Sequence, residues 1–301
     1  MSGLRPGTTA VAGLGLIGGS VALALARAGC GPVHGIDPDA GTRRAAEQAG
    51  ITVHSGPGPF LAGCRLFVLA CPPAEAGTVL GEAARYLVSG AVVTDVYSVK
   101  ASTAGLVPPG DIYYVPSHPM AGTEQSGFEA ARPDLFAGRP WAITARQKTP
   151  PHAVAAVADL VEAVGGRPVF LDPAVHDRIV AHTSHLPYLV ALALAGTVAK
   201  ASEHEPGLAY MIGPGFLDST RLAASPPSLG YEFFRYNRRF LLEAADEFLR
   251  EFSSWIARFG TDDTGSDTSK MSITQAAEAV RGFRLSLKPA TPGEGDKWKG
   301  Q

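Results

Sequence analysis

The strongest chemical signal in this sequence is a glycine-rich loop near the N-terminus. Residues 13–18 (GLGLIG) place Gly13, Gly15 and Gly18 in the pattern GxGxxG, between an expected strand (8–12) and an expected helix (16–28). The first glycine permits a tight turn, the second lets the backbone approach a pyrophosphate, and the third lets the helix lie close to the sheet. The free N–H groups at the helix start, around Leu16 and Ile17, would face the phosphates. An ordinary turn between a strand and a helix is the alternative interpretation.

An acidic residue downstream of the loop favours NAD as the cofactor. Asp37 ends the next expected strand (33–37), about 20 residues after the loop. A carboxylate there can accept hydrogen bonds from both ribose hydroxyls and would repel a 2′-phosphate. Arg43 and Arg44 offer the weaker alternative of accommodating that phosphate in NADP. The other cofactor-binding candidates follow the expected strand 66–70; they are Cys71 and Pro72.

A histidine lies where ligands of open α/β sheets collect. His118 comes just after the expected strand 112–115, and such ligands bind at the carboxyl ends of strands. Because imidazole titrates near neutral pH, His118 could exchange a proton with a hydroxyl beside a nicotinamide ring. A lone histidine in a loop more often makes a structural hydrogen bond. The residues around His118 are therefore needed to distinguish a catalytic role from a structural one.

The elements that must position these residues alternate between strands and helices. Short apolar runs predict strands at 8–12, 33–37, 66–70, 91–96, 112–115, 141–144 and 168–171. Helical spacing predicts helices at 16–28, 41–50, 74–87 and 152–164. This alternation predicts an α/β fold with an N-terminal Rossmann-type, doubly wound and mostly parallel sheet.

The second half of the chain has no strand pattern. Residues 175–202 predict a long helix that is interrupted or kinked near Pro187, and residues 228–259 predict a second long helix. A polar loop is expected at 260–269 and a final helix at 273–287. We therefore expect a dinucleotide-binding domain (1–172), an all-helical substrate and dimerisation domain (173–288) and a flexible tail (289–301).

Composition narrows the class of protein. The 301 residues are 46% hydrophobic and carry a formal charge of −2, so no basic excess favours nucleic acid as a partner. No uninterrupted apolar run reaches the length of a membrane span, and the N-terminus lacks a hydrophobic signal segment, so we expect a cytoplasmic protein that does not bind membranes. The three cysteines form no CxxC pair, and we expect no bound metal.

Several longer motifs resemble the prephenate/arogenate (cyclohexadienyl) dehydrogenase family. They are GLGLIGGS (13–20), TDVYSVK (94–100), SHPMAGTEQSG (117–127), HDRIVAHTSHLPY (176–188) and GPGFLDSTRLA (213–223). The resemblance covers residues 8–260 and implies an NAD-dependent oxidative decarboxylation. Hydride leaves C4 of a small-molecule cyclohexadienol and CO₂ leaves C1, converting prephenate to 4-hydroxyphenylpyruvate for tyrosine biosynthesis. It also implies a homodimer formed through the helical half.

The resemblance implies roles for individual residues. His118 would take the proton of the 4-hydroxyl, and Ser98 would hold the same hydroxyl or orient His118. Arg221 would bind a substrate carboxylate with its planar guanidinium, and His185 would contribute to the pocket for the side-chain carboxylate. Asp218 would orient Arg221 or join an intersubunit pair, and the remaining candidates lie near the substrate entrance: Thr123 and Glu124.

Two tyrosines depart from the family pattern and leave the substrate open. Tyr97 stands where the family has a glycine, and its phenol could reach a polar group of the substrate. Tyr188 stands where members that use prephenate often have a second histidine. Arogenate and 4-amino-4-deoxyprephenate are therefore alternative substrates for the same chemistry. A β-hydroxyacid dehydrogenase and a non-catalytic NAD sensor are the alternatives of a different class.

Overall fold

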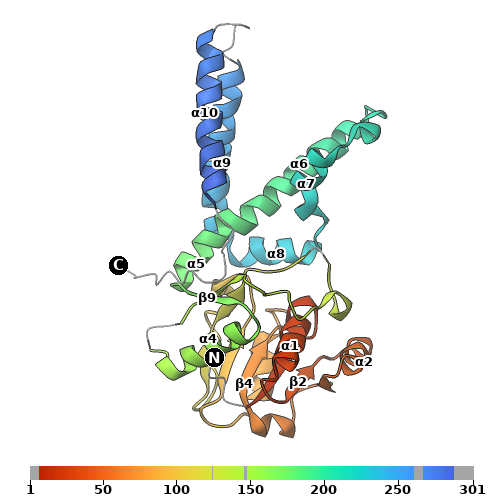
Figure 1. Cartoon of the computed structure of the whole chain (residues 1–301), viewed down its shortest axis with the longest axis vertical. Helices are drawn as coiled ribbons and strands as arrows, with labels where there is room; N and C mark the ends of the chain where they lie inside the picture. Colours follow the sequence, from red (N-terminus) through yellow and green to blue (C-terminus); the bar gives the residue numbers. More distant parts are fainter. Residues whose placement is uncertain (1–6, 124, 146–147, 261–266, 288–301) are drawn as a thin grey trace.

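The computed structural model describes residues 7–123, 125–145, 148–260 and 267–287. The N-terminal half forms a layered α/β part, and the C-terminal half forms long helices that project from it (Figure 1). The change occurs after residue 172, where helix α5 (Pro173–Val180) follows the last strand. The expected tail at 289–301 lies outside the described residues, and the expected three-part division stays a prediction.

The main sheet has the expected parallel architecture. Six strands lie in the order β3-β2-β1-β4-β5-β6, and every neighbouring pair is parallel. Their bounds are β1 Thr8–Ala12, β2 Val33–Ile36, β3 Thr52–His54, β4 Cys64–Leu69, β5 Val92–Asp95 and β6 Tyr113–Val115. All six carboxyl ends therefore meet along one edge, which carries the glycine-rich loop. Sequence patterning missed β3, which is only three residues long.

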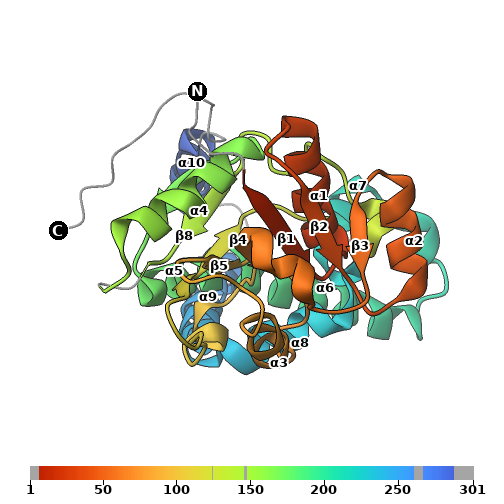
Figure 2. The ribbon, with the colours of Figure 1, turned by 90° about the horizontal axis from the view of Figure 1, so that it is seen from below.

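Helices cover both faces of this sheet (Figure 2). Helices α1 (Leu16–Ala28), α2 (Ala40–Gln48) and α4 (Pro151–Ala163) pack on one face, where Val11, Leu25 and Leu160 belong to one buried cluster. Helix α3 (Ala76–Ala83) packs on the other face, against a cluster that contains Phe67 and Leu80. Because strand side chains alternate between faces, a sheet covered on both sides needs continuously apolar strands such as β4. The doubly wound fold predicted from the sequence is confirmed.

A second, smaller sheet carries His118. Strand β7 (Ser117–Pro119) pairs antiparallel with β8 (Pro140–Ile143), which pairs parallel with β9 (Arg167–Phe170). His118 follows the end of β6, as expected, but it is the middle residue of a further strand, β7, and does not lie in a loop. Pro116 separates β6 from β7 because it has no N–H to donate to the main sheet. Its carbonyl instead accepts the Thr144 N–H (2.9 Å), which directs the chain into the second sheet.

The long helix expected at 175–202 is interrupted, as predicted near Pro187. Helix α5 leads into a π-helical turn η4 (Ala181–His185), and α6 (Leu186–Ser202) then begins with Pro187 in its first turn. Proline removes a hydrogen-bond donor, and π turns are frequent at functional sites. The run Pro173–Ser202 is long and apolar enough to cross a membrane by length and composition, a property that core helices of soluble proteins share.

The other helical expectations need correction. Residues 228–259 are not one helix: α8 (Pro227–Tyr236) ends at Asn237 and α9 (Arg238–Gly260) begins after it. The apolar spacing continues across the break, so periodicity could not reveal it. Helix α10 (Asp267–Ser286) starts inside the loop expected at 260–269. Shorter elements connect α6 to α8: η5 (Leu208–Met211), α7 (Pro214–Thr220) and η6 (Arg221–Ala224).

Candidate active site

The glycine-rich loop joins β1 to α1, and its geometry explains each glycine. Gly13 has φ +93°, and a Cβ there would lie 2.5 Å from the Cys71 nitrogen. A Cβ on Gly18 would lie 1.9 Å from the Gly13 carbonyl oxygen. At Gly15, by contrast, a Cβ would meet nothing within 4 Å. The loop is therefore tight against the protein at both ends and open in the middle, at the N-terminus of α1, where Leu16 and Ile17 are half-buried. This shape suits a bound pyrophosphate.

The side chain of Asp37 forms a hydrogen bond with the same loop. Its Oδ2 accepts the Leu14 N–H (2.9 Å) and its Oδ1 accepts the Asp39 N–H (2.9 Å). Arg43 donates from Nη1 to the carbonyls of Asp37 (2.8 Å) and Pro38 (2.7 Å). The carboxylate thus lies at the end of β2 beside the glycine loop, as the dinucleotide fingerprint requires. These residues fit an adenosine ribose with free hydroxyls.

Tyr97 is directed toward the cofactor loop. Its ring is buried, its hydroxyl pairs with the Cys71 thiol (3.5 Å), and its N–H donates to Asp95 Oδ1 (3.0 Å). Burial raises the pKa of both the Tyr97 phenol and the Cys71 thiol, so both stay protonated near neutral pH. The backbone of Ala70 and Cys71 lies next to Gly13, and Pro72, the following residue, is exposed. The expected contact of Tyr97 with the substrate stays a prediction.

A buried polar network fixes strand β7. The Ser117 carbonyl accepts from Lys100 Nζ, which is also paired with Asp95, and the Ser117 hydroxyl donates to the Asp95 carbonyl (2.6 Å). Trp141 Nε1 donates to the Ser117 hydroxyl (3.0 Å). Lys100 is only 3% exposed, and burial lowers the pKa of its ammonium group against the opposing effect of Asp95. Lys100 is therefore a structural charge that holds the backbone of the strand on which His118 lies.

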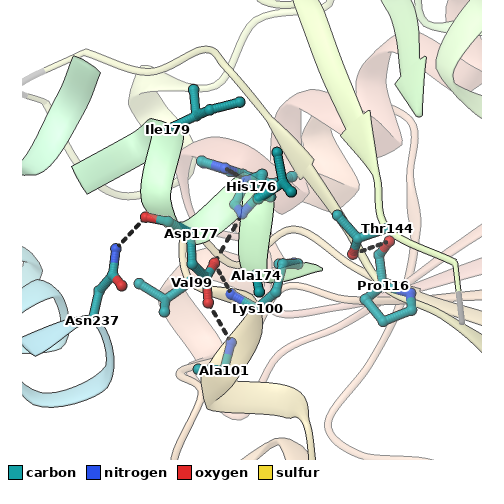
Figure 3. A network of polar contacts seen from close by, with 12 residues as sticks. Val99, Lys100, Ala101, Pro116, Thr144, Ala174, His176, Asp177, Ile179 and Asn237 are labelled. Carbon is teal, nitrogen blue, oxygen red and sulfur yellow. Dashed lines mark hydrogen bonds and ion pairs between the residues drawn. The ribbon is translucent and has the colours of Figure 1, made fainter. Parts of the chain in front are cut away.

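His118 belongs to a chain of three buried side chains. Its Nδ1 lies 2.9 Å from His176 Nε2, and His176 Nδ1 lies 2.9 Å from Asp177 Oδ1. The Asp177 carboxylate also accepts the N–H groups of Lys100 (2.7 Å) and Ala101 (2.8 Å), as Figure 3 shows. Asp177 thereby connects α5 to the loop after β5.

The hydrogen-bond roles along this chain determine the tautomers. A carboxylate only accepts, so His176 Nδ1 carries a proton; in the neutral His176 ring, Nε2 then accepts from His118 Nδ1. His118 Nε2 is then the nitrogen with a free lone pair. Burial, and next the proximity of His176, Lys100 and His185, hold the pKa of His118 well below its ordinary value. His118 is therefore a neutral imidazole that is oriented as a proton acceptor.

Sequence reasoning missed the roles of His176 and Asp177. Both residues are in the motif HDRIVAHTSHLPY, and both are buried in the structure. An adjacent His-Asp pair within the short helix α5 was the available signal. It could not show which strand the pair would face, because that depends on how α5 docks on the α/β part.

His185 and Tyr188 share an aromatic neighbour from α8. The fully buried His185 ring stacks on Phe233 with centroids 4.0 Å apart, and the Tyr188 ring meets Phe233 edge-on at 5.8 Å. A Cβ on Gly230 would lie 2.4 Å from Tyr188 Cε1, so the tyrosine ring fits only because residue 230 is glycine. Burial lowers the pKa of His185 to about 4, and the ring is neutral near pH 7.

The other candidates occupy more open positions. Ser98 is half-buried in the loop after β5 and does not cap the 3₁₀ turn η2 (Lys100–Thr103). Thr123 is exposed, and Glu124 lies outside the described residues. Asp218 on α7 and Arg221 at the start of η6 are exposed, and η6 packs against α6. Within the described ranges, no group of three or more His, Cys, Asp or Glu side chains could hold a metal ion.

Two family models together match most of the chain, from residue 21 to residue 265. One is described as prephenate dehydrogenase, nucleotide-binding domain, and matches residues 21–170. The other is described as prephenate dehydrogenase, dimerization domain, and matches residues 172–265. The two matches meet within two residues of the start of α5.

Three similar proteins illustrate the range of relatives. A cyclohexadienyl dehydrogenase of Zymomonas mobilis is 35% identical over 65% of this chain and 68% of its own length. The crystal structure of prephenate dehydrogenase from A. aeolicus, in complex with hydroxyphenyl propionate and NAD⁺, has a TM-score of 0.82 at 25% identity and covers 94% of this chain and 98% of that one. The crystal structure of Synechocystis arogenate dehydrogenase has a TM-score of 0.74 at 26% identity and covers 92% and 99%.

Proposed function

Since the chain belongs to the prephenate dehydrogenase family, we propose that it catalyses the NAD-dependent oxidative decarboxylation of prephenate to 4-hydroxyphenylpyruvate. The observation that carries this proposal is the His118–His176–Asp177 chain, which presents His118 Nε2 as a neutral base. Arogenate and 4-amino-4-deoxyprephenate are the alternative substrates. Tyr188 supports these alternatives. It places a phenol where members that use prephenate, which has an α-keto acid side chain, often have an imidazole.

The chemistry divides between cofactor and protein. NAD⁺, held by the glycine loop and Asp37, supplies the hydride acceptor. His118 accepts the proton of the 4-hydroxyl through Nε2 as the C4 hydride leaves and carbonyl character develops. Loss of CO₂ from C1 then returns an electron pair to the ring, and the ring oxygen of the aromatic product recovers a proton. His176 and Asp177 stabilise the charge that forms on His118, since the Asp177 carboxylate lies at the far end of the chain.

Substrate binding by the remaining candidates is part of the same proposal. Ser98 would hold the 4-hydroxyl, Arg221 would pair with a carboxylate and His185 would face the side-chain carboxylate. Arg221 is exposed, so its guanidinium group is accessible to a substrate carboxylate from solvent. The remaining proposed substrate-binding residues are Tyr97, Thr123, Glu124, Tyr188 and Asp218.

We propose that the helical half forms a homodimer and that the enzyme is cytoplasmic. The family model for residues 172–265 is described as a dimerization domain. Helix α9 supports an interface because its exposed apolar side chains recur at helical spacing: Leu242, Leu249, Phe252 and Ile256. The division into residues 1–172 and 173–288 is part of the same proposal.

The test of the function is NADH formation with each substrate in turn. Purified protein and NAD⁺ are offered prephenate, arogenate and 4-amino-4-deoxyprephenate, with NADH absorbance and CO₂ release followed together. We expect turnover of prephenate with one CO₂ released per NADH. A preference for one of the other two would move the assignment to that substrate. Bound NAD⁺ without turnover of any of them would contradict the proposal.

Asp37 is expected to control the choice of cofactor. Replacing it with serine removes a charge-assisted contact to the ribose, so the KM for NAD⁺ should rise about 10-fold or more, while that for NADP⁺ should fall because repulsion of a 2′-phosphate is lost. Steady-state kinetics with both cofactors measure this. Asp39→Ser is the control, because Asp39 is an exposed acid that caps α2 two residues away. Equal effects of both variants would remove Asp37 from the ribose site.

The pH profile should reflect the depressed pKa of His118. The base works in its neutral form, and its pKa is held well below the ordinary value near 6.5. As pH falls, activity should therefore persist through 6.5 and decline only in more acidic solution. The measurement is kcat/KM for the substrate as a function of pH. An acid limb centred at or above 6.5 would contradict a buried, neutral His118 as the base.

A further inference from the structure

The break between α8 and α9 places a single buried amide in the active site. Asn237 is the only asparagine in the 301 residues, and it is 2% exposed. Its backbone leaves the helical conformation at φ −116°, ψ 23°. An asparagine side chain competes with helical hydrogen bonding, which fits a helix end at this residue. The side chain points from the α8–α9 junction toward Asp177 on α5 (Figure 3).

The contacts of Asn237 determine the orientation of its amide. Nδ2 lies 2.7 Å from the Asp177 backbone carbonyl and 3.1 Å from His185 Nδ1. A backbone carbonyl can only accept, so the group facing it must be the NH₂. The second hydrogen of the same NH₂ then points to His185. His185 Nδ1 must therefore accept, and the proton of the neutral ring is on Nε2.

The other nitrogen of His185 has no hydrogen-bond partner among the residues that the structure describes. His185 Nε2 is fully buried and makes no hydrogen bond to any described residue. A buried N–H without a partner is costly, so its retention indicates a ligand that accepts from it. The ring plane is fixed by stacking on Phe233, four residues before Asn237. One segment, α8 and its terminal asparagine, thus controls both the plane and the tautomer of His185.

We infer that Asn237 is a positioning residue that holds His185 in its Nε2–H tautomer, so that His185 presents a neutral N–H to a carboxylate or carbonyl oxygen of the substrate. The identity of the bound molecule rests on the proposed function, but the tautomer does not. Asp177 connects the two parts of the site. Its carboxylate determines the tautomers of His176 and His118. Its backbone carbonyl determines the orientation of the Asn237 amide, which in turn determines the tautomer of His185.

The first experiment reads the tautomer directly in the full-length, ligand-free protein. Two-bond ¹H–¹⁵N correlation spectra of the eight histidines distinguish protonated from bare ring nitrogens, and loss of one signal in His185→Gln assigns the residue. At pH 7 we expect His185 to carry its proton on Nε2 alone. Selective labelling of asparagine gives one side-chain NH₂ pair, whose two proton shifts report the two hydrogen bonds. A proton on Nδ1 in the unsubstituted protein would overturn the inference.

The second experiment changes the amide. In Asn237→Asp a carboxylate replaces the NH₂, so His185 should gain a proton on Nδ1 and become charged at pH 7. In Asn237→Leu the hydrogen bonds are lost without a new charge, and the KM for the substrate should rise about 2- to 10-fold while the KM for NAD⁺ is unchanged. Arg238→Ala, an exposed neighbour at the same junction, is the matched control and should alter neither value.

The outcomes separate this inference from the proposed function. An unchanged protonation state of His185 in Asn237→Asp, or equal KM changes for substrate and NAD⁺ in Asn237→Leu, would contradict a positioning role. If the protein turned over none of the three candidate substrates, the proposed function would fail, and the ring spectra would still decide the tautomer.

Discussion

Replacing His118 with alanine is expected to lower kcat by about 10²- to 10⁴-fold while leaving NAD⁺ binding nearly unchanged. The reason is that His118 is the terminal imidazole of the series His118–His176–Asp177, and its Nε2 contacts neither of the other two side chains. Its loss removes the acceptor for the substrate hydroxyl proton, an interaction made as the transition state develops. The residue lies in the small sheet and does not contribute to the glycine loop. Steady-state kinetics and NAD⁺ titration of the purified variant measure the two effects.

A matched control is His204→Ala, which removes an exposed histidine on the helical half. It should leave kcat within about 2-fold of the unsubstituted enzyme, as is usual for surface substitutions. Because His118 is 8% exposed and packs on His176, thermal unfolding of His118→Ala must be followed in parallel. A folded variant that keeps more than a tenth of the original kcat would exclude His118 as the general base.

The second large effect is expected at Asp177, which touches no substrate in the proposed scheme. In Asp177→Asn, an amide N–H can face His176 Nδ1, which would then have to accept. His176 would carry its proton on Nε2, and His118 would be turned to the tautomer with its proton on Nε2. In serine proteases the corresponding change behind the catalytic histidine costs about 10⁴-fold in kcat for this reason. We expect a loss of about 10²- to 10⁴-fold here, measured as kcat with saturating NAD⁺.

Asp172→Asn separates the tautomer effect from the loss of a helix cap. Asp172 accepts the N–H groups of Ala174 and Val175 at the start of the same helix, whereas Asp177 accepts those of Lys100 and Ala101. Both substitutions weaken a carboxylate that binds backbone N–H groups, but only Asp177 contacts a histidine. Similar losses of kcat in the two variants would show that helix docking, and not tautomer control, is what Asp177 contributes.

Much of the nucleotide-binding half follows from local sequence. The helix predicted at 16–28 is observed as Leu16–Ala28, and the strand predicted at 8–12 is observed as Thr8–Ala12. Both are bounded by residues whose backbone requirements are readable, such as Gly13 at positive φ and Gly29 in the left-handed region at the end of α1. The position of Asp37 relative to the loop is equally local, because the connection between β1 and β2 is a single helix.

Sequence by itself therefore determined the parallel sheet, the dinucleotide loop, and the types of residue available for proton transfer and anion binding. Only the tertiary structure decided which of them meet. His118 and His176 are 58 residues apart and belong to different halves of the chain, and Asn237 lies 60 residues beyond Asp177. The helical spacing of apolar residues continues through Asn237. Such spacing indicates which side chains face the core, but it does not indicate where a side-chain amide forms hydrogen bonds that end the helix. Hydrogen-bond direction between distant side chains depends on how α5 and α8 dock, and that docking fixes the tautomers of the site.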